Sequence, residues 1–312
     1  MSPNHYKNIL IIKHGSLGDI ISSTSVMKSI KDNYNNSNIV LLTSTKYREF
    51  MRKSNLVNEI LIDDRRGVFS SLNILFSIIN AKFDLIVDLQ NSTRTLCYGL
   101  FFRFFSSSKI NGTHFIYQER YIYNRNSPPS VIKGLSNQVS LIGCKPNDKP
   151  YVSWLKLSNL YFQEINNKKF FLISPGCSIK HVQKKWPEQN YIDICRFLLS
   201  SNITPVLIGA REDKEVIDII SNEDDKILNL CNQSPLNVVY TLAVKAEGAL
   251  SNDSGPAHLI AASGCKVHII LSSFSNPKTV IPQSNNVSFS QSDKIFQISS
   301  KEIIMQIKKI LK

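Results

Sequence analysis

Short apolar runs alternate with longer segments of helical spacing along the first half of the chain. The apolar runs cover residues 8–13, 38–43, 57–62 and 83–89, and helical patterns occupy residues 20–34, 45–53 and 69–80 between them. Apolar runs of this length, bounded by turn residues, are typical of strands buried on both faces of a parallel sheet. The alternation therefore predicts βα units in series, with helices covering a parallel sheet.

A second series of the same kind begins near residue 170. Strands are expected at 170–174, 203–208, 226–230 and 266–271, with helices at 187–201, 236–247 and 301–311. Residues 145–169 break the periodicity and read as a linker. The pattern predicts two α/β domains, residues 1–155 and 156–312, and leaves open whether the last helix packs back on the first domain.

Polar side chains follow the predicted strands of the first domain. Ligands of a parallel sheet bind beyond the carboxyl ends of its strands, so these side chains should converge there. They are Asp19, Arg65, Arg66, Gln90, Asn91 and Arg94. Asp19 ends the turn His14-Gly-Ser-Leu-Gly-Asp19, where a carboxylate also suits a helix start. The glycines of this turn are spaced G-x-x-G and not G-x-G-x-x-G, so the sequence gives little support for a dinucleotide-binding site.

Two further segments of this domain carry aromatic residues. Residues 95–105 are nearly all apolar, which favours core packing and leaves an interfacial membrane contact as the alternative. Residues 113–129 have weak periodicity and hold Arg120 and Arg125. They are expected to form a long loop at the same edge.

The stretch Asn252-Asp-Ser-Gly-Pro-Ala-His-Leu-Ile-Ala-Ala-Ser-Gly264 predicts a strand, a tight turn and a helix. Asp253 or Ser254 can cap the helix, and Pro256 suits its first turn. Gly255 lets a ligand approach the backbone, and the unpaired N–H groups of a helix start bind phosphate. His258 lies close enough to face the same ligand. A well-capped α/β turn without a ligand is the alternative.

Composition narrows the class of protein. The 312 residues include 42% hydrophobic and 20% charged residues, as in a soluble globular protein. The six cysteines show no C-x-x-C spacing and are expected to be reduced thiols. The apolar run Ile9–Ile12 is too short for a signal peptide, and no apolar stretch is long enough to cross a membrane. A cytoplasmic protein is expected, and no carboxylate pair is spaced to hold a metal.

The net charge of +13 is concentrated in the first half. Residues 1–160 hold 20 Lys and Arg against 10 Asp and Glu, whereas residues 161–312 hold 17 against 14. Such an excess suits nucleic acid, an anionic membrane surface or an acidic substrate, and it also fits an ordinary Lys-rich surface. The chain lacks the signatures of nucleic-acid-binding folds, so nucleic acid is not an expected partner.

Four separated stretches occur in a recognisable order. They are Ile9-Leu-Ile-Ile-Lys-His-Gly-Ser-Leu-Gly-Asp-Ile20, Ser174-Pro-Gly-Cys-Ser178, Lys184-Lys-Trp-Pro187 and Asp253-Ser-Gly-Pro-Ala-His258. Together they resemble glycosyltransferase family 9, the ADP-heptose:lipopolysaccharide heptosyltransferases, from residue 8 to about 282. The resemblance implies the GT-B architecture of two Rossmann-like domains facing across a cleft, with the acceptor on the first domain and the nucleotide sugar on the second.

The resemblance also implies roles for individual residues. Asp19 is the general base on the acceptor hydroxyl, and Lys184 with Ser178 contacts the donor diphosphate. The helix start at Ser254, Gly255 and Pro256 binds phosphate, with His258 alongside it. Asp253 lies near the donor sugar, and Asp213 contacts the ribose, with Glu212 as its rival. Because residues 179–183 are longer and less polar than the family pattern, Lys180 and Lys185 compete with Lys184.

The implied reaction is an inverting, metal-independent transfer of heptose from ADP-L-glycero-D-manno-heptose to the inner core of lipopolysaccharide, without a cofactor. The anionic acceptor would meet Arg65, Arg66, Arg94, Arg120 and Arg125. The protein would then work in the cytoplasm, with a peripheral contact to the inner membrane as a further expectation. Alternatives are another nucleotide sugar, a protein acceptor, a basic nucleic-acid-binding protein, or an inactive relative that only binds nucleotide sugar.

Overall fold

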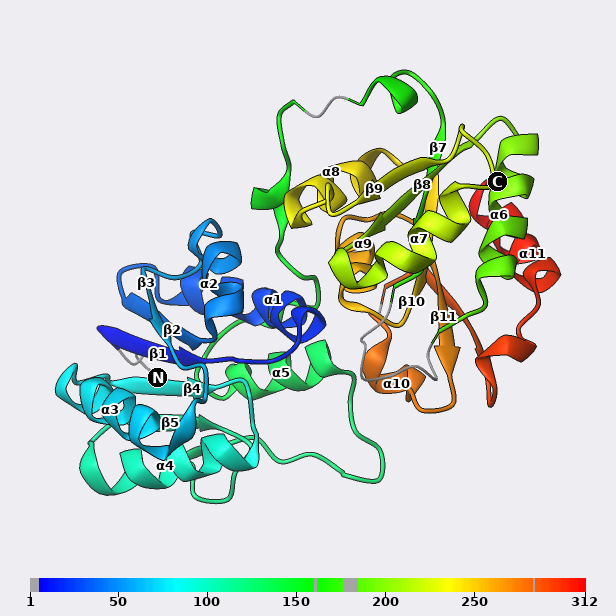
Figure 1. The fold of residues 1–312 in the computed structure, drawn as a ribbon. Coiled ribbons are helices and arrows are strands. Elements are labelled where there is room, and N and C mark those ends of the chain that lie inside the picture. Colours follow the sequence, from blue (N-terminus) through cyan, green and yellow to red (C-terminus); the bar gives the residue numbers. More distant parts are fainter. Residues whose placement is uncertain (1–5, 160–161, 177–184, 283) are drawn as a thin grey trace. The chain divides into compact units, whose positions relative to one another are not determined.

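The structure is a computed structural model that describes residues 6–159, 162–176, 185–282 and 284–312. The chain divides into two compact units, Met1–Trp154 and Leu155–Lys312 (Figure 1). Each unit is a parallel sheet covered by helices, as the alternating pattern predicts. The two are described separately below.

The first unit contains a six-stranded sheet in the order β3-β2-β1-β4-β5-β6, and every neighbouring pair is parallel. Its strands are β1 (Asn8–Ile12), β2 (Asn38–Thr43), β3 (Glu59–Ile62), β4 (Leu85–Asp88), β5 (Lys109–Gly112) and β6 (Glu119–Arg120). Its helices are α1 (Leu17–Asn33), α2 (Thr45–Arg52), α3 (Gly67–Asn80), α4 (Thr93–Phe105) and α5 (Val131–Ser140). This is the strand order of the Rossmann fold. Strands β2 and β3 are added on one side of β1, and the chain then crosses back to add β4 on the other side. We call the place between β1 and β4, at the carboxyl edge of the sheet, the reversal point.

The second unit repeats that order. Its sheet runs β12-β11-β10-β7-β8-β9, again with parallel neighbours. Its strands are β7 (Phe170–Ser174), β8 (Thr204–Gly209), β9 (Leu228–Cys231), β10 (Gly248–Asn252), β11 (Val267–Ser272) and β12 (Val287–Ser292). Its helices are α6 (Glu188–Ser200), α7 (Lys214–Ser221), α8 (Leu236–Lys245), α9 (Gly255–Ala262), α10 (Pro277–Val280) and α11 (Ser300–Ile310).

Short 3₁₀ turns complete the secondary structure of the described residues. They are η1 (Ser153–Leu155), η2 (Gln163–Ile165), η4 (Arg211–Asp213) and η5 (Ile295–Gln297). Two predicted segments contain elements that the sequence pattern did not predict. The predicted linker contains η1 and η2, and the predicted long loop contains the short strand β6.

The final helix packs inside the second unit. Ile303, Ile307 and Ile310 of α11 join a core with Phe171, Trp186 and other side chains of that unit. The indole N–H of Trp186 donates to the carbonyl of Ile298 just before α11 (2.8 Å). The apolar stripe of α11 is thus covered by side chains of its own unit.

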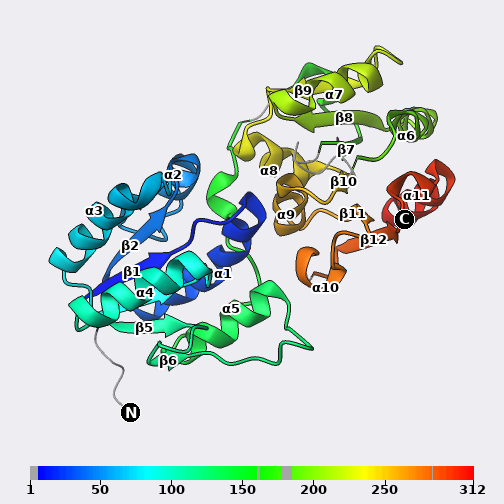
Figure 2. The same cartoon turned by 60° about the horizontal axis from the view of Figure 1, so that its bottom comes forward.

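The helices of the first unit cover both faces of its sheet. Helices α1 and α5 pack together, and α3 packs beside α4 (Figures 1 and 2). The core under α3 and α4 includes Leu75, Ile78 and Phe102 against Leu10 and Ile86 of the sheet. With its helices packed on the faces, the sheet leaves its carboxyl edge to the loops that follow the strands.

One buried titratable group of the second unit predicts a pH effect on folding. His268 of β11 is fully buried, with Nδ1 2.8 Å from Ser288 Oγ and Nε2 3.1 Å from Ser290 Oγ. Burial, and secondarily the charge of Lys309, lowers the pKa of His268 to about 4. A histidine pKa that is depressed on folding gives stability that is present above about pH 6.5 and is lost as the pH falls towards 4.

We therefore expect the free energy of unfolding to drop between pH 6.5 and 4, by up to about 3 kcal/mol from this residue. His268→Asn removes the titration and should flatten that part of the curve, although it lowers stability at neutral pH. Urea unfolding of both proteins at half-unit pH steps measures the difference. An equally steep loss in the variant would assign the effect to other groups.

Candidate functional site

The loops that follow β1 and β4 are tied together at the reversal point of the first sheet. The side-chain carbonyl of Gln90 accepts from the backbone N–H groups of His14 and Gly15 (3.0 and 2.9 Å). Lys13, which is buried, donates from Nζ to the carbonyl of Leu89 (2.9 Å). These bonds fix the glycine turn at the place where ligands of this fold bind.

Asp19 stands in the first turn of α1, directly after this turn. Its Oδ2 accepts from the N–H of Ser16 (2.8 Å) while its own N–H approaches Ser16 Oγ (3.4 Å), a reciprocal capping box. The capping role and the catalytic role are compatible. Asp19 is half-buried, and no described residue hydrogen-bonds its Oδ1. A Cβ on Gly15 would lie 2.4 Å from Asp19 Cβ, so only glycine fits beside the carboxylate.

Lys13 is a residue of this site to which the sequence pattern gave no role. Burial lowers its pKa, and attraction to the carboxylates of Asp19 and Asp88 opposes that shift. When protonated, Lys13 supplies a positive charge beneath the turn that carries Asp19. The available signal was a lysine at the end of an otherwise apolar strand, because such a cation is rarely buried without a partner.

A buried network of polar side chains holds the loop that follows β3, at the same carboxyl edge of the sheet. Asp63, which follows β3, accepts from Tyr98 Oη (2.7 Å) and from the N–H of Arg65 (2.8 Å). Nε2 of His14 lies 3.2 Å from Asp63 Oδ2, close enough for an ion pair although not aligned as a hydrogen bond. Burial raises the pKa of Asp63, but the interactions with His14, Tyr98 and the Arg65 N–H outweigh it and bring the pKa to about 2.

This network involves one of the predicted acceptor residues. Arg94 is half-buried and donates to Ser71 Oγ (3.2 Å) and Tyr98 Oη (3.3 Å). Its guanidinium therefore supports the packing of α3 against α4. A direct contact of Arg94 with the acceptor stays a prediction.

The remaining predicted arginines are exposed and lie far apart. Arg65, in the left-handed region at φ 60°, and Arg66 follow β3 at one end of the sheet. Arg120 is in β6 at the other end, with Arg125 in the loop beyond it. Five strand spacings of about 4.8 Å separate β3 from β6, roughly 24 Å. One small anion cannot touch both groups, which instead flank the turn that carries Asp19.

The second unit has its reversal point between β7 and β10. Asn252, the last residue of β10, donates to the carbonyl of Pro175 (2.8 Å) and accepts from Tyr191 Oη (2.7 Å). Helix α9 begins at Gly255 immediately after this strand. The fold therefore places a helix start at the carboxyl edge, where the N–H groups of the first turn are available to an anion.

The two candidate caps of that helix, Ser254 and Asp253, make different contacts. Ser254 occupies the N-cap position but makes no side-chain capping bond, and its Oγ lies 3.3 Å from Ser251 Oγ. The Asp253 carboxylate accepts from Ser275 Oγ (2.6 Å). Ser275 is itself buried, and its backbone carbonyl accepts from Gln291 Nε2 (2.8 Å). The sequence reasoning missed this support because Ser275 lies in another loop.

Asp213 lies against the loop that follows β7. A Cβ on Gly176 would stand 2.2 Å from Asp213 Oδ1, and the N–H of Ala210 donates to Oδ2 (3.0 Å). Burial raises the pKa of Asp213, and the charge of Lys185 opposes that shift. Glu212, the rival, is exposed. Of the two, it is Asp213 that the fold holds beside the reversal point.

Two of the predicted donor contacts, Ser178 and Lys184, lie outside the described residues, as does the rival lysine Lys180. Lys185 is described and exposed, near enough to Asp213 to influence its pKa. His258 is half-buried on α9. Within the described ranges, no group of three His, Cys, Asp or Glu side chains is arranged to hold a metal.

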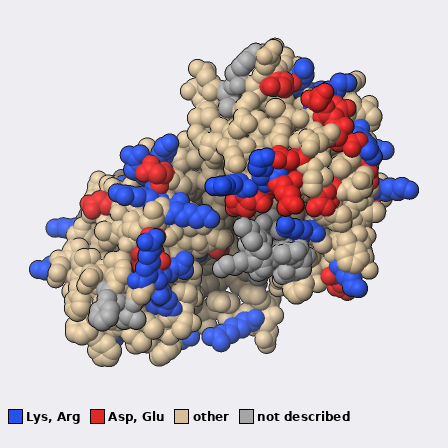
Figure 3. Space-filling view, in the orientation of Figure 1, with Lys and Arg blue, Asp and Glu red and all other residues tan. Residues whose placement is uncertain are grey.

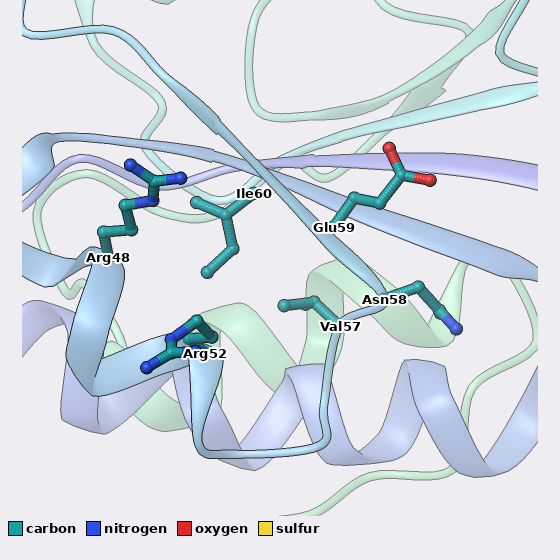
Figure 4. Close-up of a pocket in the computed structure, with 6 residues that line it drawn as sticks. All are labelled: Arg48, Arg52, Val57, Asn58, Glu59 and Ile60. Atoms are coloured by element: carbon teal, nitrogen blue, oxygen red, sulfur yellow. The ribbon is translucent and has the colours of Figure 1, made fainter.

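A separate hollow in the first unit lies away from this edge. Figure 4 shows it between α2 and the start of β3, lined by Arg48, Arg52, Val57, Asn58, Glu59 and Ile60. Arg52 is paired with Glu49 (2.9 Å). The hollow is at the amino end of β3, so it does not belong with the residues around Asp19.

The chain is similar in sequence to a known family of glycosyltransferases. The model of the family described as glycosyltransferase family 9 (heptosyltransferase) matches residues 75–302. The lipopolysaccharide core heptosyltransferase OpsX of Haemophilus influenzae is 24% identical over 295 residues, covering 89% of this chain and 82% of OpsX. Lipooligosaccharide heptosyltransferase 2 of Campylobacter jejuni is 24% identical over 262 residues, covering 78% of this chain and 74% of that protein.

Solved structures share the fold over nearly the whole chain. A glycosyltransferase family 9 protein from Veillonella parvula has a TM-score of 0.80 at 15% identity, covering 99% of this chain and 98% of that one. The E. coli heptosyltransferase WaaC with ADP has a TM-score of 0.77 at 13% identity, covering 97% and 99%. These matches extend the family resemblance from the motifs to the complete two-unit fold.

Proposed function

The chain belongs to glycosyltransferase family 9, and from that premise we propose that it transfers heptose from ADP-L-glycero-D-manno-heptose to the inner core of lipopolysaccharide. The observation that carries the proposal is the pair of reversal points. One presents a carboxylate whose Oδ1 receives no hydrogen bond from a described residue, and the other presents a helix start that the Ser254 side chain does not cap. A base and an anion site are the two elements that sugar transfer from a nucleotide needs.

The second unit is proposed to bind the donor. The N–H groups at the start of α9 and the Ser254 hydroxyl suit the diphosphate, since they carry positive partial charge in fixed positions. Lys184 and Ser178 are proposed to add a cation and a hydroxyl. Asp253, which accepts from Ser275, is proposed to accept from hydroxyls of the sugar. Asp213 is proposed to accept from the ribose, with His258 beside the phosphates.

The first unit is proposed to activate the acceptor. Asp19 Oδ1 takes the proton of the acceptor hydroxyl, whose oxygen attacks the anomeric carbon while the bond to the ADP phosphate oxygen breaks. Attack from the opposite face inverts the configuration. Fixed donors stabilise the charge that develops on ADP, so no metal is required in this proposal. Retained activity in excess chelator is the expected result.

The acceptor is proposed to be anionic. Exposed arginines flank the turn of Asp19 on both sides, and guanidinium groups make paired contacts with phosphate and carboxylate. A protein acceptor or a neutral glycan gives this arrangement no role. We also propose that the enzyme works in the cytoplasm, where its nucleotide-sugar donor is made, and that nucleic acid is not its partner.

Arg66→Ala tests the acceptor proposal with little structural cost. Arg66 is exposed, and Asp64, at 3.9 Å, is its one ion-pair partner among the residues that the structure describes. Its loss should raise the acceptor KM about threefold to tenfold, because an exposed charge contact to a phosphate is worth roughly 1 kcal/mol. The donor KM should not change. Lys301→Ala, an exposed cation of α11, is the matched control, and an acceptor KM unchanged in both variants would contradict the assignment.

The activity itself is tested by release of the donor's nucleoside diphosphate, which is ADP or UDP according to the nucleotide sugar. Purified protein is incubated with ADP-heptose, ADP-glucose or UDP-glucose, each with and without lipopolysaccharide core that lacks the terminal heptose. Release that requires both ADP-heptose and the core is expected. Turnover with another nucleotide sugar alone would replace the donor, and tight ADP binding without any turnover would identify an inactive relative.

A further inference from the structure

The outer surface of α3 and α4 is unusually rich in exposed aromatic side chains. Phe104 is 79% exposed, Phe105 61%, Phe76 53% and Leu100 39%. The same helices bury Leu75, Ile78, Tyr98 and Phe102 against the sheet. The apolar segment 95–105 therefore serves two purposes. Part of it is core, as the sequence favours, and part faces outwards.

The exposed rings form one surface. Phe76 of α3 contacts Phe101 of α4 (5.2 Å between ring centroids), and Phe101 contacts Phe105 (4.9 Å). Phe104 and Leu100 continue it along α4, one turn apart. We call Phe76, Leu100, Phe101, Phe104 and Phe105 the aromatic face. A contiguous apolar surface of this kind marks an interaction site more often than scattered single residues do.

Cations outnumber anions around this face. Residues 67–83 and 89–118 contain no Asp or Glu, whereas Arg103 of α4, Lys82 after α3 and Lys109 after α4 are exposed. The neighbouring anions are Asp84, two residues after Lys82, and Glu119, which lies 4.0 Å from Lys109. In the view of Figure 3, most of the visible acidic side chains are on the second unit. The surroundings of the aromatic face thus attract an anionic surface.

This excess of cations also favours one class of partner. Symmetric pairing of two copies through this face would bring the cations of both copies together, which opposes association. An anionic lipid surface has no such penalty, since its headgroups attract Lys and Arg while its interface accepts aromatic rings.

We propose that the aromatic face of α3 and α4, with Lys82, Arg103 and Lys109, docks the protein on an anionic phospholipid membrane. This docking proposal rests on the proposed function in one respect, which is that a lipid-linked acceptor explains why the protein binds a membrane. The binding itself follows from the surface. No helix of the described ranges is long and apolar enough to cross a bilayer, so the contact is peripheral.

Co-sedimentation of the full chain with vesicles tests the proposal. Binding to vesicles of phosphatidylcholine with one quarter phosphatidylglycerol should exceed binding to phosphatidylcholine alone by about tenfold, and it should weaken in high salt. The double change Phe104→Ser with Phe105→Ser should reduce the partition coefficient by about tenfold, and Arg103→Glu by about fivefold or more.

Matched controls separate docking from general surface effects. Phe296→Ser removes a ring that is 62% exposed in the second unit, and Lys301→Glu reverses an exposed cation there. Neither should change vesicle binding. Melting temperatures of all variants, and their ADP release with a soluble, delipidated core acceptor, should match the parent protein.

Each other outcome overturns the docking proposal. Parent protein that stays in solution, equal binding to both kinds of vesicle, or equal binding of the Phe104 and Phe105 variant would do so. Concentration-dependent dimers that this variant abolishes would assign the face to a second copy. Since transfer to the soluble acceptor is measured separately, failure of docking is distinguishable from failure of the proposed function.

Discussion

Asp19→Asn is expected to slow turnover by roughly two to four orders of magnitude while the protein keeps its fold. Asparagine has an oxygen that can accept from Ser16 as Asp19 Oδ2 does, and it caps helices about as well as aspartate. It cannot take a proton from the acceptor hydroxyl. Turnover, ADP affinity and melting temperature of the variant, measured together, separate the catalytic role from the cap.

The control for Asp19→Asn is Asp32→Asn near the other end of α1, where the exposed carboxylate pairs with Lys28. That variant should keep full activity. ADP affinity should be near the parent value in both, because the proposed donor contacts belong to the second unit. Turnover of Asp19→Asn within a few-fold of the parent would leave Asp19 as a cap and require another base.

Lys184→Ala is expected to weaken ADP binding by about 10-fold to 150-fold and to slow turnover as well. Loss of a charge-assisted contact to a bound phosphate costs about 1.5–3 kcal/mol. Lys180→Ala and Lys185→Ala are matched controls in the same segment. Lys185 is exposed and acts electrostatically on Asp213, so its loss should have the smaller effect.

Isothermal titration of ADP into the three variants ranks the lysines directly. If Lys185→Ala or Lys180→Ala loses the most affinity, the phosphate role moves to that residue. If none of the three changes ADP affinity, the diphosphate is held by the start of α9 without a lysine from this segment.

Much of the fold was determined by local sequence. Strands such as Asn8–Ile12 and Phe170–Ser174 are continuous apolar runs, because both faces of a parallel sheet are buried. The glycine turn before Asp19 and the Gly255-Pro256 helix start are also local, since they depend on backbone geometry within a few residues. These features sufficed for the fold class and the family.

The strands that the sequence missed have a common reason. β5 (Lys109–Gly112) and β12 (Val287–Ser292) contain several polar residues or glycine, and β6 is only two residues long. β12 and β6 are edge strands with one neighbour each, so less apolar surface is required of them. Their strand character comes from pairing with distant segments, which periodicity does not report.

Tertiary structure alone decided how the candidate residues are held. The contacts of Gln90 with the turn at Gly15, and of Ser275 with Asp253, join residues 75 and 22 positions apart. The split of residues 95–105 into buried and exposed rings depends on where α3 and the sheet lie against α4. Local sequence fixes which backbone shapes are possible, whereas partners and burial depend on strand order and helix packing, which only the folded chain defines.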